Sequence, residues 1–153
     1  MATTELSVPE AVHIGIDDLP FVEIGGGNML RVLQVKEEEG LWIIENIFQK
    51  GFAVQTHRHT GPVWGFTVSG GWKYKEYDYV NRAGSFLYEP AGSIHTLECV
   101  EDDTRVWFHM SGVNLNIDAE GNVESVADGA GTLAFYLAMC EQQGLGRPDV
   151  CIG

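Results

Sequence analysis

Basic residues are scarce in this chain. Only 9 lysines and arginines stand against 22 aspartates and glutamates, which gives a formal net charge of −13 over 153 residues. A chain this acidic repels nucleic acid and anionic lipid, so we expect no nucleic-acid and no membrane partner. No apolar run approaches the roughly 18 residues that a transmembrane helix needs. The start, MATTELSVPEAVHIG, lacks the basic and apolar regions of a signal peptide and favours a cytoplasmic location.

Cysteine is also rare. Cys99, Cys140 and Cys151 are odd in number and do not have the spacing of metal ligands. In a cytoplasmic protein we expect them to be reduced thiols with mainly structural roles, and we expect no disulfide among them.

The apolar content, by contrast, is that of a folded domain. Hydrophobic residues make up 44% of the chain and aromatic residues 10%, which excludes disorder, and the length suits one domain. From about residue 12, short β-like runs such as VWGFTVSG and SFLYEP are separated by glycines at spacings near ten residues. This pattern predicts an all-β sandwich or barrel. We therefore expect a flexible N-terminus at 1–11 and a single domain at 12–153.

One segment near the end has helical rather than strand periodicity. Within GTLAFYLAMCEQQG, the residues Leu133, Tyr136, Leu137 and Cys140 recur at helical spacing, and a glycine follows. The sequence predicts a short C-terminal helix at about 131–143, packed on the outside of the strands.

Two histidines one residue apart raise the question of a metal site. In an extended segment His57 and His59 share a face while Arg58 points away. An H-x-H pair alone is weak evidence for a metal site, because such a pair is more often a surface or core pair than a ligand pair. The stretch Gly51–His59 has the pattern G-x5-H-x-H, and Gly84–His95 has the pattern G-x5-P-x-G-x2-H.

Together these two spacings resemble the paired motifs of the cupin superfamily. The resemblance covers about residues 28–115 and implies a jelly-roll β-barrel that holds a divalent metal. It implies that His57, His59 and His95 are metal ligands. The glutamate usual in the first motif is missing, because Val63 and Trp64 stand at its positions. Either the site has three histidines, or a carboxylate comes from elsewhere.

The strand-like stretch WKYKEY offers such a carboxylate. Alternation puts Trp72, Tyr74 and Glu76 on one face and the lysines on the other, so we expect Glu76 to point into the barrel. A buried glutamate needs a partner, and Glu76 is a candidate metal ligand or general base. The alternative is a structural salt bridge at the barrel mouth. Among the other histidines, we expect His109 to be a core residue or to support the ligands, and His13 to be structural.

A more specific resemblance is carried by the segments HRHTGP, WKYKE and EPAGSIHTL. They look like the family of 2,4'-dihydroxyacetophenone dioxygenase, with acetylacetone-cleaving dioxygenase and the cupin domain of the ChrR-type anti-sigma factor as more distant relatives. The resemblance implies a mononuclear Fe²⁺ dioxygenase that uses O₂ to cleave a C–C bond beside a carbonyl in a small hydroxy-ketone or diketone. Imidazole ligands also suit Zn²⁺ and Ni²⁺. Four side chains are candidate walls of the substrate pocket: Val63, Trp72, Tyr74 and Leu97.

Two other functions compete with this one. The first is a metal-binding sensor or binding module of the anti-sigma-factor type. That type normally has a partner-binding segment before the cupin, and fewer than thirty residues precede the barrel here. The second is a structural metal cupin or one with non-oxidative chemistry. We also expect a homodimer or homotetramer formed through outer strands.

Overall fold

The computed structural model describes residues 7–153, so the predicted flexible segment 1–11 falls partly outside the described residues. Short, mainly antiparallel strands dominate this part of the chain, as predicted. In chain order the elements are β1 (Val22–Gly25), β2 (Asn28–Lys36), the 3₁₀ helix η1 (Glu37–Glu39), β3 (Leu41–Phe48), β4 (His57–His59), β5 (Val63–Ser69), β6 (Gly71–Tyr74), β7 (Asn81–Arg82), β8 (Phe86–Glu89), β9 (Ile94–His95), β10 (Leu97–Cys99), β11 (Thr104–Ser111), β12 (Asn114–Ile117), β13 (Val123–Ala127), α1 (Gly129–Gln142) and β14 (Cys151–Ile152).

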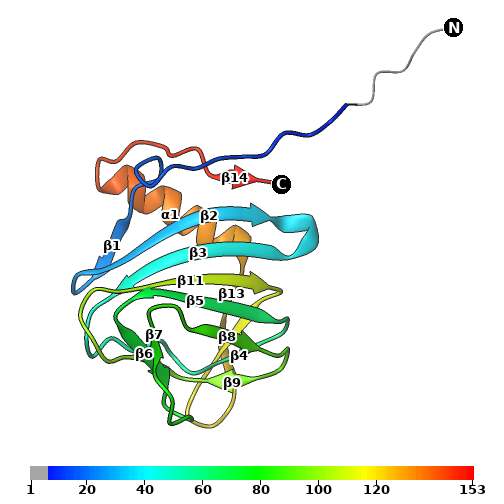
Figure 1. Ribbon diagram of the computed structural model, residues 1–153. Coiled ribbons are helices and arrows are strands. Elements are labelled where there is room, and N and C mark those ends of the chain that lie inside the picture. Colours follow the sequence, from blue (N-terminus) through cyan, green and yellow to red (C-terminus); the bar gives the residue numbers. More distant parts are fainter. Residues whose placement is uncertain (1–6) are drawn as a thin grey trace, which may run out of the picture.

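The strands form three sheets in a jelly-roll arrangement. The large sheet has the order β1-β2-β3-β11-β5-β8, and β14 runs parallel to β2 beside it. The smaller sheets have the orders β10-β6-β7 and β13-β12-β4-β9. In Figure 1 the strands β2, β3, β11 and β5 lie one below the other, with β6, β7, β4 and β9 beneath them. The all-β architecture is confirmed, although the three sheets do not join into one continuous hydrogen-bonded barrel.

Regular alternation gives the large sheet an inner and an outer face. Along β11, Val106, Phe108 and Met110 are buried, while Trp107 and His109 are exposed. The buried apolar residues of β3, β5 and β11 belong to the hydrophobic core of the domain. The expectation of a core or supporting role for His109 is therefore wrong, because its register places it on the outer face.

The predicted C-terminal helix is confirmed as α1. It begins two residues earlier than expected, because the Asp128 side chain accepts a hydrogen bond from the Gly131 N–H and caps the first turn. Tyr136 and Cys140 are buried, and the helix packs against β1 and β2. Within the described residues, no helix is both long and apolar enough to cross a membrane.

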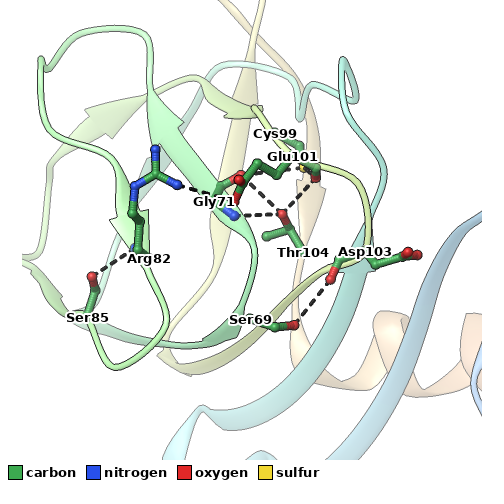
Figure 2. Close-up of polar contacts among 8 residues, drawn as sticks. All are labelled: Ser69, Gly71, Arg82, Ser85, Cys99, Glu101, Asp103 and Thr104. Carbon is green, nitrogen blue, oxygen red and sulfur yellow. Dashed lines mark hydrogen bonds and ion pairs between the residues drawn. The ribbon is translucent and has the colours of Figure 1, made fainter.

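A polar junction ties the small sheet β10-β6-β7 to the large sheet (Figure 2). The buried Thr104 hydroxyl, on β11, accepts a hydrogen bond from the Gly71 N–H at 2.9 Å and donates to the Glu101 carbonyl at 2.8 Å. The Cys99 thiol donates to the same carbonyl at 3.0 Å. These bonds fix the position of β10, which directly follows the strand that carries His95. All three cysteines are free thiols, as predicted.

Candidate metal centre

The two histidines of β4 face the interior of the domain. Along His57–His59 the two imidazoles are buried and Arg58 is exposed, as expected for an extended segment. Strand β4 pairs with β9 in a register that places His57 opposite His95. Its other neighbour, β12, places Asn114 opposite His59. The pairing of three short strands thus brings together residues that are far apart in the sequence.

A buried carboxylate lies among these three imidazoles. The Nε2 atoms of His57 and His59 are 3.1 Å apart, and His59 Nε2 lies 3.0 Å from Glu89 Oε2. His95 Nε2 lies 3.9 Å from Glu89 Oε1. Ligand atoms of His59, Glu89 and His95 all lie within 4.8 Å of one another. His57 adjoins this group of three through its contact with His59, and we call the four side chains the donor ring.

Hydrogen bonds on the far side of two rings fix which nitrogen carries the proton. His57 Nδ1 lies 2.7 Å from the Gln55 carbonyl oxygen, which can only accept, so this nitrogen donates. His59 Nδ1 lies 2.6 Å from Asn114 Oδ1, and the Asn114 amide donates to the Met110 sulfur. In neutral rings the lone pairs are then on the two Nε2 atoms, which face each other. A bound cation would relieve this contact.

Two members of the donor ring, Glu89 and His95, lack hydrogen-bond partners of their own. Both carboxylate oxygens of Glu89 and both ring nitrogens of His95 are buried without a hydrogen bond in the described structure. Burial lowers the pKa of His57. Burial and, to a smaller extent, the neighbouring His59 ring lower the pKa of His95 to about 4. Both rings are therefore neutral at pH 7 and able to bind a metal.

The donor ring fits a divalent ion. Two donors that bind one first-row ion at right angles, each at about 2.1 Å, lie about 3 Å apart. The two shortest separations, 3.1 and 3.0 Å, match this value. Imidazole and carboxylate together suit iron, zinc and nickel. A cation also balances the buried charge of Glu89, which would otherwise be costly to desolvate.

Glu76 does not belong to this ring. Strand β6 ends at Tyr74, the chain turns at Lys75, and Glu76 is exposed. Its Oε2 accepts a hydrogen bond from the Thr96 N–H at 2.9 Å. Partial burial alone would raise the pKa of Glu76, but the hydrogen bonds from Thr96 lower it. The expectation that Glu76 points into the barrel is wrong, because the alternation on which it rested stops two residues earlier.

A small apolar cavity adjoins the donor ring. Its volume is about 170 Å³, and His57, His59, Glu89 and Asn114 contribute to its wall. Apolar side chains supply most of the rest of the wall: Ile24, Trp42, Ile44, Phe48, Phe52, Val54, Tyr74, Leu97, Phe108 and Met110. Tyr74 also stacks on the His95 ring, with centroids 4.2 Å apart.

Of the four predicted wall residues, Tyr74 and Leu97 line this cavity and the other two do not. Val63 is buried beside Glu89, its partner in the pairing of β5 with β8. Trp72 is fully buried, and its indole N–H donates to the Thr67 hydroxyl at 2.9 Å. Both are packing residues behind the site.

Sequence reasoning missed Glu89, although a signal for it exists. In the run Phe86–Glu89, Leu87 and Glu89 are buried while Phe86 and Tyr88 are exposed. The same alternation argument that was applied to Glu76 therefore selects Glu89. Asn114 had no comparable signal, because it is 55 residues from His59 and only the sheet brings them together.

Comparison with known proteins now identifies the family. Residues 9–114 match the family model described as the ChrR cupin-like domain, and this range contains the whole donor ring. The chain belongs to this cupin family. A search of curated proteins found no match.

Solved structures support the cupin fold over almost the whole chain. A protein of unknown function with a cupin-like fold from Ralstonia eutropha JMP134 is 29% identical, with a TM-score of 0.85, and the match covers 97% of this chain and 96% of the other. An acetylacetone dioxygenase from Acinetobacter johnsonii is 19% identical, with a TM-score of 0.75, covering 91% and 98% of the two chains. The anti-sigma factor ChrR from Rhodobacter sphaeroides, solved with SigE, is 18% identical, with a TM-score of 0.53, covering 63% and 52%. The last two likenesses are of fold alone.

Proposed function

We propose that this cupin is a mononuclear metal-dependent dioxygenase that cleaves a C–C bond beside a carbonyl in a small ketone. The observation that carries the proposal is the buried donor ring, in which His59, Glu89 and His95 lie close together and His57 adjoins His59, next to an apolar cavity lined by His57, His59 and Glu89. The likeness of fold to an acetylacetone dioxygenase supports this chemistry. We assign Fe²⁺ as the native metal, with Zn²⁺ and Ni²⁺ as alternatives that the same donors would accept.

The protein side of this chemistry is positioning and exclusion of water. A bound divalent ion would act as a Lewis acid for a chelating enolate and as the site at which O₂ reacts. The Gln55 carbonyl and Asn114 hold the His57 and His59 rings in the ligating orientation. Glu89 lines the cavity and neither of its carboxylate oxygens has a hydrogen-bond partner, so we assign it as the base that accepts the acidic proton of the substrate. Each fragment receives one atom of O₂, so no external reductant is required.

The size of the cavity narrows the substrate. Pockets for drug-sized ligands have volumes of about 300–1,000 Å³, whereas this one has about 170 Å³. The cavity has a mainly apolar wall, and its polar side chains include His57, His59 and Glu89 of the donor ring. Such a cavity suits a short aliphatic 1,3-diketone or hydroxy-ketone. An aromatic ketone such as 2,4'-dihydroxyacetophenone is larger, and we expect it to react more slowly.

The test is O₂ uptake by the Fe²⁺-loaded protein with a panel of aliphatic and aromatic ketones, with metal analysis of the same samples. We expect about one metal ion per chain, uptake that depends on a short diketone or hydroxy-ketone, and loss of most metal and activity in His95→Ala. Full metal content in that variant would refute the ligand assignment. Metal binding without O₂ uptake on any ketone would refute the dioxygenase.

A second candidate is a metal-binding sensor of the anti-sigma-factor type. The family model and the likeness to ChrR favour it. It shares the metal centre but requires no substrate cavity, and it predicts bound metal with no turnover. The O₂-uptake panel therefore separates the two functions.

A further inference from the structure

A row of aromatic rings leads from His95 to the surface of the domain. Tyr74, the last residue of β6, stacks on the His95 ring, with centroids 4.2 Å apart and ring planes 16° apart. The Tyr77 ring follows, 6.4 Å from Tyr74 and 6.3 Å from His95, and Tyr79 stacks on Tyr77 at 5.4 Å. Centroid distances of this size are those of aromatic rings in direct contact. We call the rings of Tyr74, Tyr77 and Tyr79 the tyrosine row.

The tyrosine row passes from the interior to solvent. Tyr74 is 2% exposed, whereas Tyr77 is 42% and Tyr79 is 46% exposed. Partial burial raises the pKa of Tyr79 above its ordinary value of 10.0, so its phenol carries a proton at pH 7. A phenol that loses an electron becomes strongly acidic and gives up this proton. Tyr79 can release the proton to water and the buried Tyr74 cannot, so an oxidised tyrosine is most stable at the exposed end of the row.

Hydrogen bonds hold the turn that carries Tyr77 against the strand of His95. The Lys75 N–H donates to the Thr96 carbonyl at 2.9 Å, and the Thr96 N–H donates to Glu76 Oε2 at 2.9 Å. Thr96 directly follows His95 in the chain. The contact between His95 and the tyrosine row is therefore fixed by the backbone on both sides.

A second branch of rings leaves Tyr74 and ends inside the core. The Trp72 ring meets Tyr74 edge-on at 5.2 Å, and Phe108 meets Trp72 at 5.5 Å. Trp72 is fully buried and Phe108 is 7% exposed. Phenylalanine is also far harder to oxidise than tyrosine or tryptophan. This branch therefore gives an oxidising equivalent no route to solvent, whereas the branch through Tyr77 does.

We propose that the tyrosine row protects the metal centre by carrying oxidising equivalents from the donor ring to the surface. The proposal rests on metal binding at the donor ring and not on the identity of the ketone. A redox-active ion that reacts with hydrogen peroxide in the absence of substrate would otherwise oxidise its own ligands. Tyrosine is among the most easily oxidised side chains, and the row supplies three of them in contact, the first against His95.

The electrons balance in a reaction with one molecule of hydrogen peroxide. The peroxide takes up two electrons and two protons and becomes two molecules of water. One electron comes from Fe²⁺, which becomes Fe³⁺. The other comes from Tyr79 by way of Tyr77 and Tyr74, and Tyr79 releases its proton to water and becomes a neutral radical. A small thiol in solution then returns a hydrogen atom to Tyr79 and becomes a thiyl radical.

The test is the site of oxidation when the Fe²⁺-loaded full chain receives hydrogen peroxide without a ketone. EPR detects a tyrosyl radical, and a nitroso spin trap followed by peptide mass spectrometry locates it. We expect the trapped radical mainly on Tyr79. Tyr88 is the matched control tyrosine, because it is 50% exposed and its ring lies beside Trp64, outside the tyrosine row.

A reference reaction removes the effect of accessibility. Metal-free protein treated with Fe²⁺–EDTA and peroxide meets hydroxyl radicals from solution, and the ratio of label on Tyr79 to label on Tyr88 then reflects exposure alone. The Fe²⁺-loaded protein should give a clearly higher ratio. A ratio equal to the reference would overturn the proposal, because the oxidant would then have reached Tyr79 through solvent.

Tyr77→Phe interrupts the row and keeps the packing of the ring. Before peroxide is added, its metal content should be that of the wild type. With peroxide it should lose most of the label on Tyr79, and it should lose bound iron after less peroxide, because oxidation then falls on His95 and its neighbours. Tyr88→Phe should change neither the label on Tyr79 nor the loss of iron.

Undiminished label on Tyr79 in Tyr77→Phe would overturn the proposal. Label on Tyr79 in a protein that oxidises no ketone would support the tyrosine row and refute the dioxygenase alone, so the two failures are distinguishable.

Discussion

Two glutamates lie near His95, and their surroundings assign them different roles. Glu89 is buried and its oxygens have no hydrogen-bond partner, while Glu76 is exposed and bound to the Thr96 N–H. A carboxylate with no other partner gains most from a cation, whereas one that is already satisfied gains little. Substitution of Glu89 and of Glu76 therefore tests whether a metal ion needs the carboxylate inside the donor ring.

We predict that Glu89→Gln weakens metal binding by about 10–100-fold or more. Losses of this size are known for residues that only hydrogen-bond to a metal ligand, so they are a lower bound for a ligand itself. The amide keeps the shape of the side chain and removes the negative charge. Glu76→Gln should keep its metal, because its side chain lies outside the ring. Metal content after dialysis, measured by atomic spectroscopy, checks both. Equal losses in the two variants would contradict the assignment.

A second prediction concerns the support of His59. Asn114→Ala removes the acceptor that holds His59 Nδ1 and should lower metal affinity by about 10–100-fold. Asn116→Ala is the control on the same strand, because the Asn116 side-chain amide donates to the exposed Ser125 hydroxyl and not to an imidazole of the donor ring. Competition titration with a coloured chelator measures both affinities. If Asn116→Ala has the larger effect, Asn114 does not orient the ring.

At the residue scale, the sequence predicts the ligands that lie on regular strands. The resemblance of the two histidine motifs to those of cupins groups His57, His59 and His95. The alternation argument fails at Glu76, because β6 ends at Tyr74 and nothing local distinguishes a continuing strand from a turn at Lys75. Asn114 and the Gln55 carbonyl depend on pairing between distant strands, which spacing does not contain.

Among the elements, the turn between β5 and β6 is the most tightly constrained. Gly70 has φ +78°, and a Cβ there would lie 2.3 Å from the Thr104 hydroxyl and 2.6 Å from the Thr104 Cα. Gly84, between β7 and β8, has a similar φ of +84° but no atom within 4 Å of the same position. Substitution of Gly84 therefore tests the cost of the backbone conformation alone, and substitution of Gly70 tests that cost together with the cost of steric overlap.

We predict that Gly84→Ala destabilises the fold by about 1–2 kcal/mol, the cost of a left-handed residue with a Cβ. Gly70→Ala should cost about 1–3 kcal/mol more, because the methyl group also displaces Thr104 and its hydrogen bonds to Gly71 and Glu101. Urea unfolding curves measure the difference. Equal urea midpoints for the two variants would show that the hydrogen-bonded junction in Figure 2 makes room for the methyl group without a further loss of stability.

Element types were easier to predict than their assembly. The helix at 129–142 has a periodic apolar face and is followed by Gly144, so it was found to within two residues. The division of the strands into three sheets was not predicted. It depends on pairings such as β3 with β11, which join residues about sixty positions apart.

For the molecule as a whole, the buried histidines make stability depend on pH. The pKa values of His57 and His95 are lowered in the folded protein, that of His95 from 6.5 to about 4. Between these values the unfolded chain binds the proton more readily than the folded chain does, so the free energy of unfolding decreases as pH falls. Above pH 6.5 these two groups add no pH dependence.

We therefore predict that the melting temperature of the metal-free protein falls as pH is lowered from about 6.5 to 4. The His95→Gln variant lacks one of the titrating groups and should show a shallower fall. Thermal melts in the presence of a chelator, at constant ionic strength, check this. An identical slope of melting temperature against pH in the two proteins would show that His95 does not contribute to the pH dependence.

The proposed ligands come from two different sheets, which has a consequence for the lifetime of the protein. His57, His59 and His95 belong to β4 and β9, whereas Glu89 is on β8, the last strand of the large sheet. An ion bound by all four side chains would link β8, the edge strand of the large sheet, to the sheet that contains β4 and β9. Without the ion, β8 is held in its sheet by β5 alone, so it can unfold locally and expose unpaired backbone groups. Proteases should then cut the metal-free chain first around β8, so a cell short of metal would clear this protein faster.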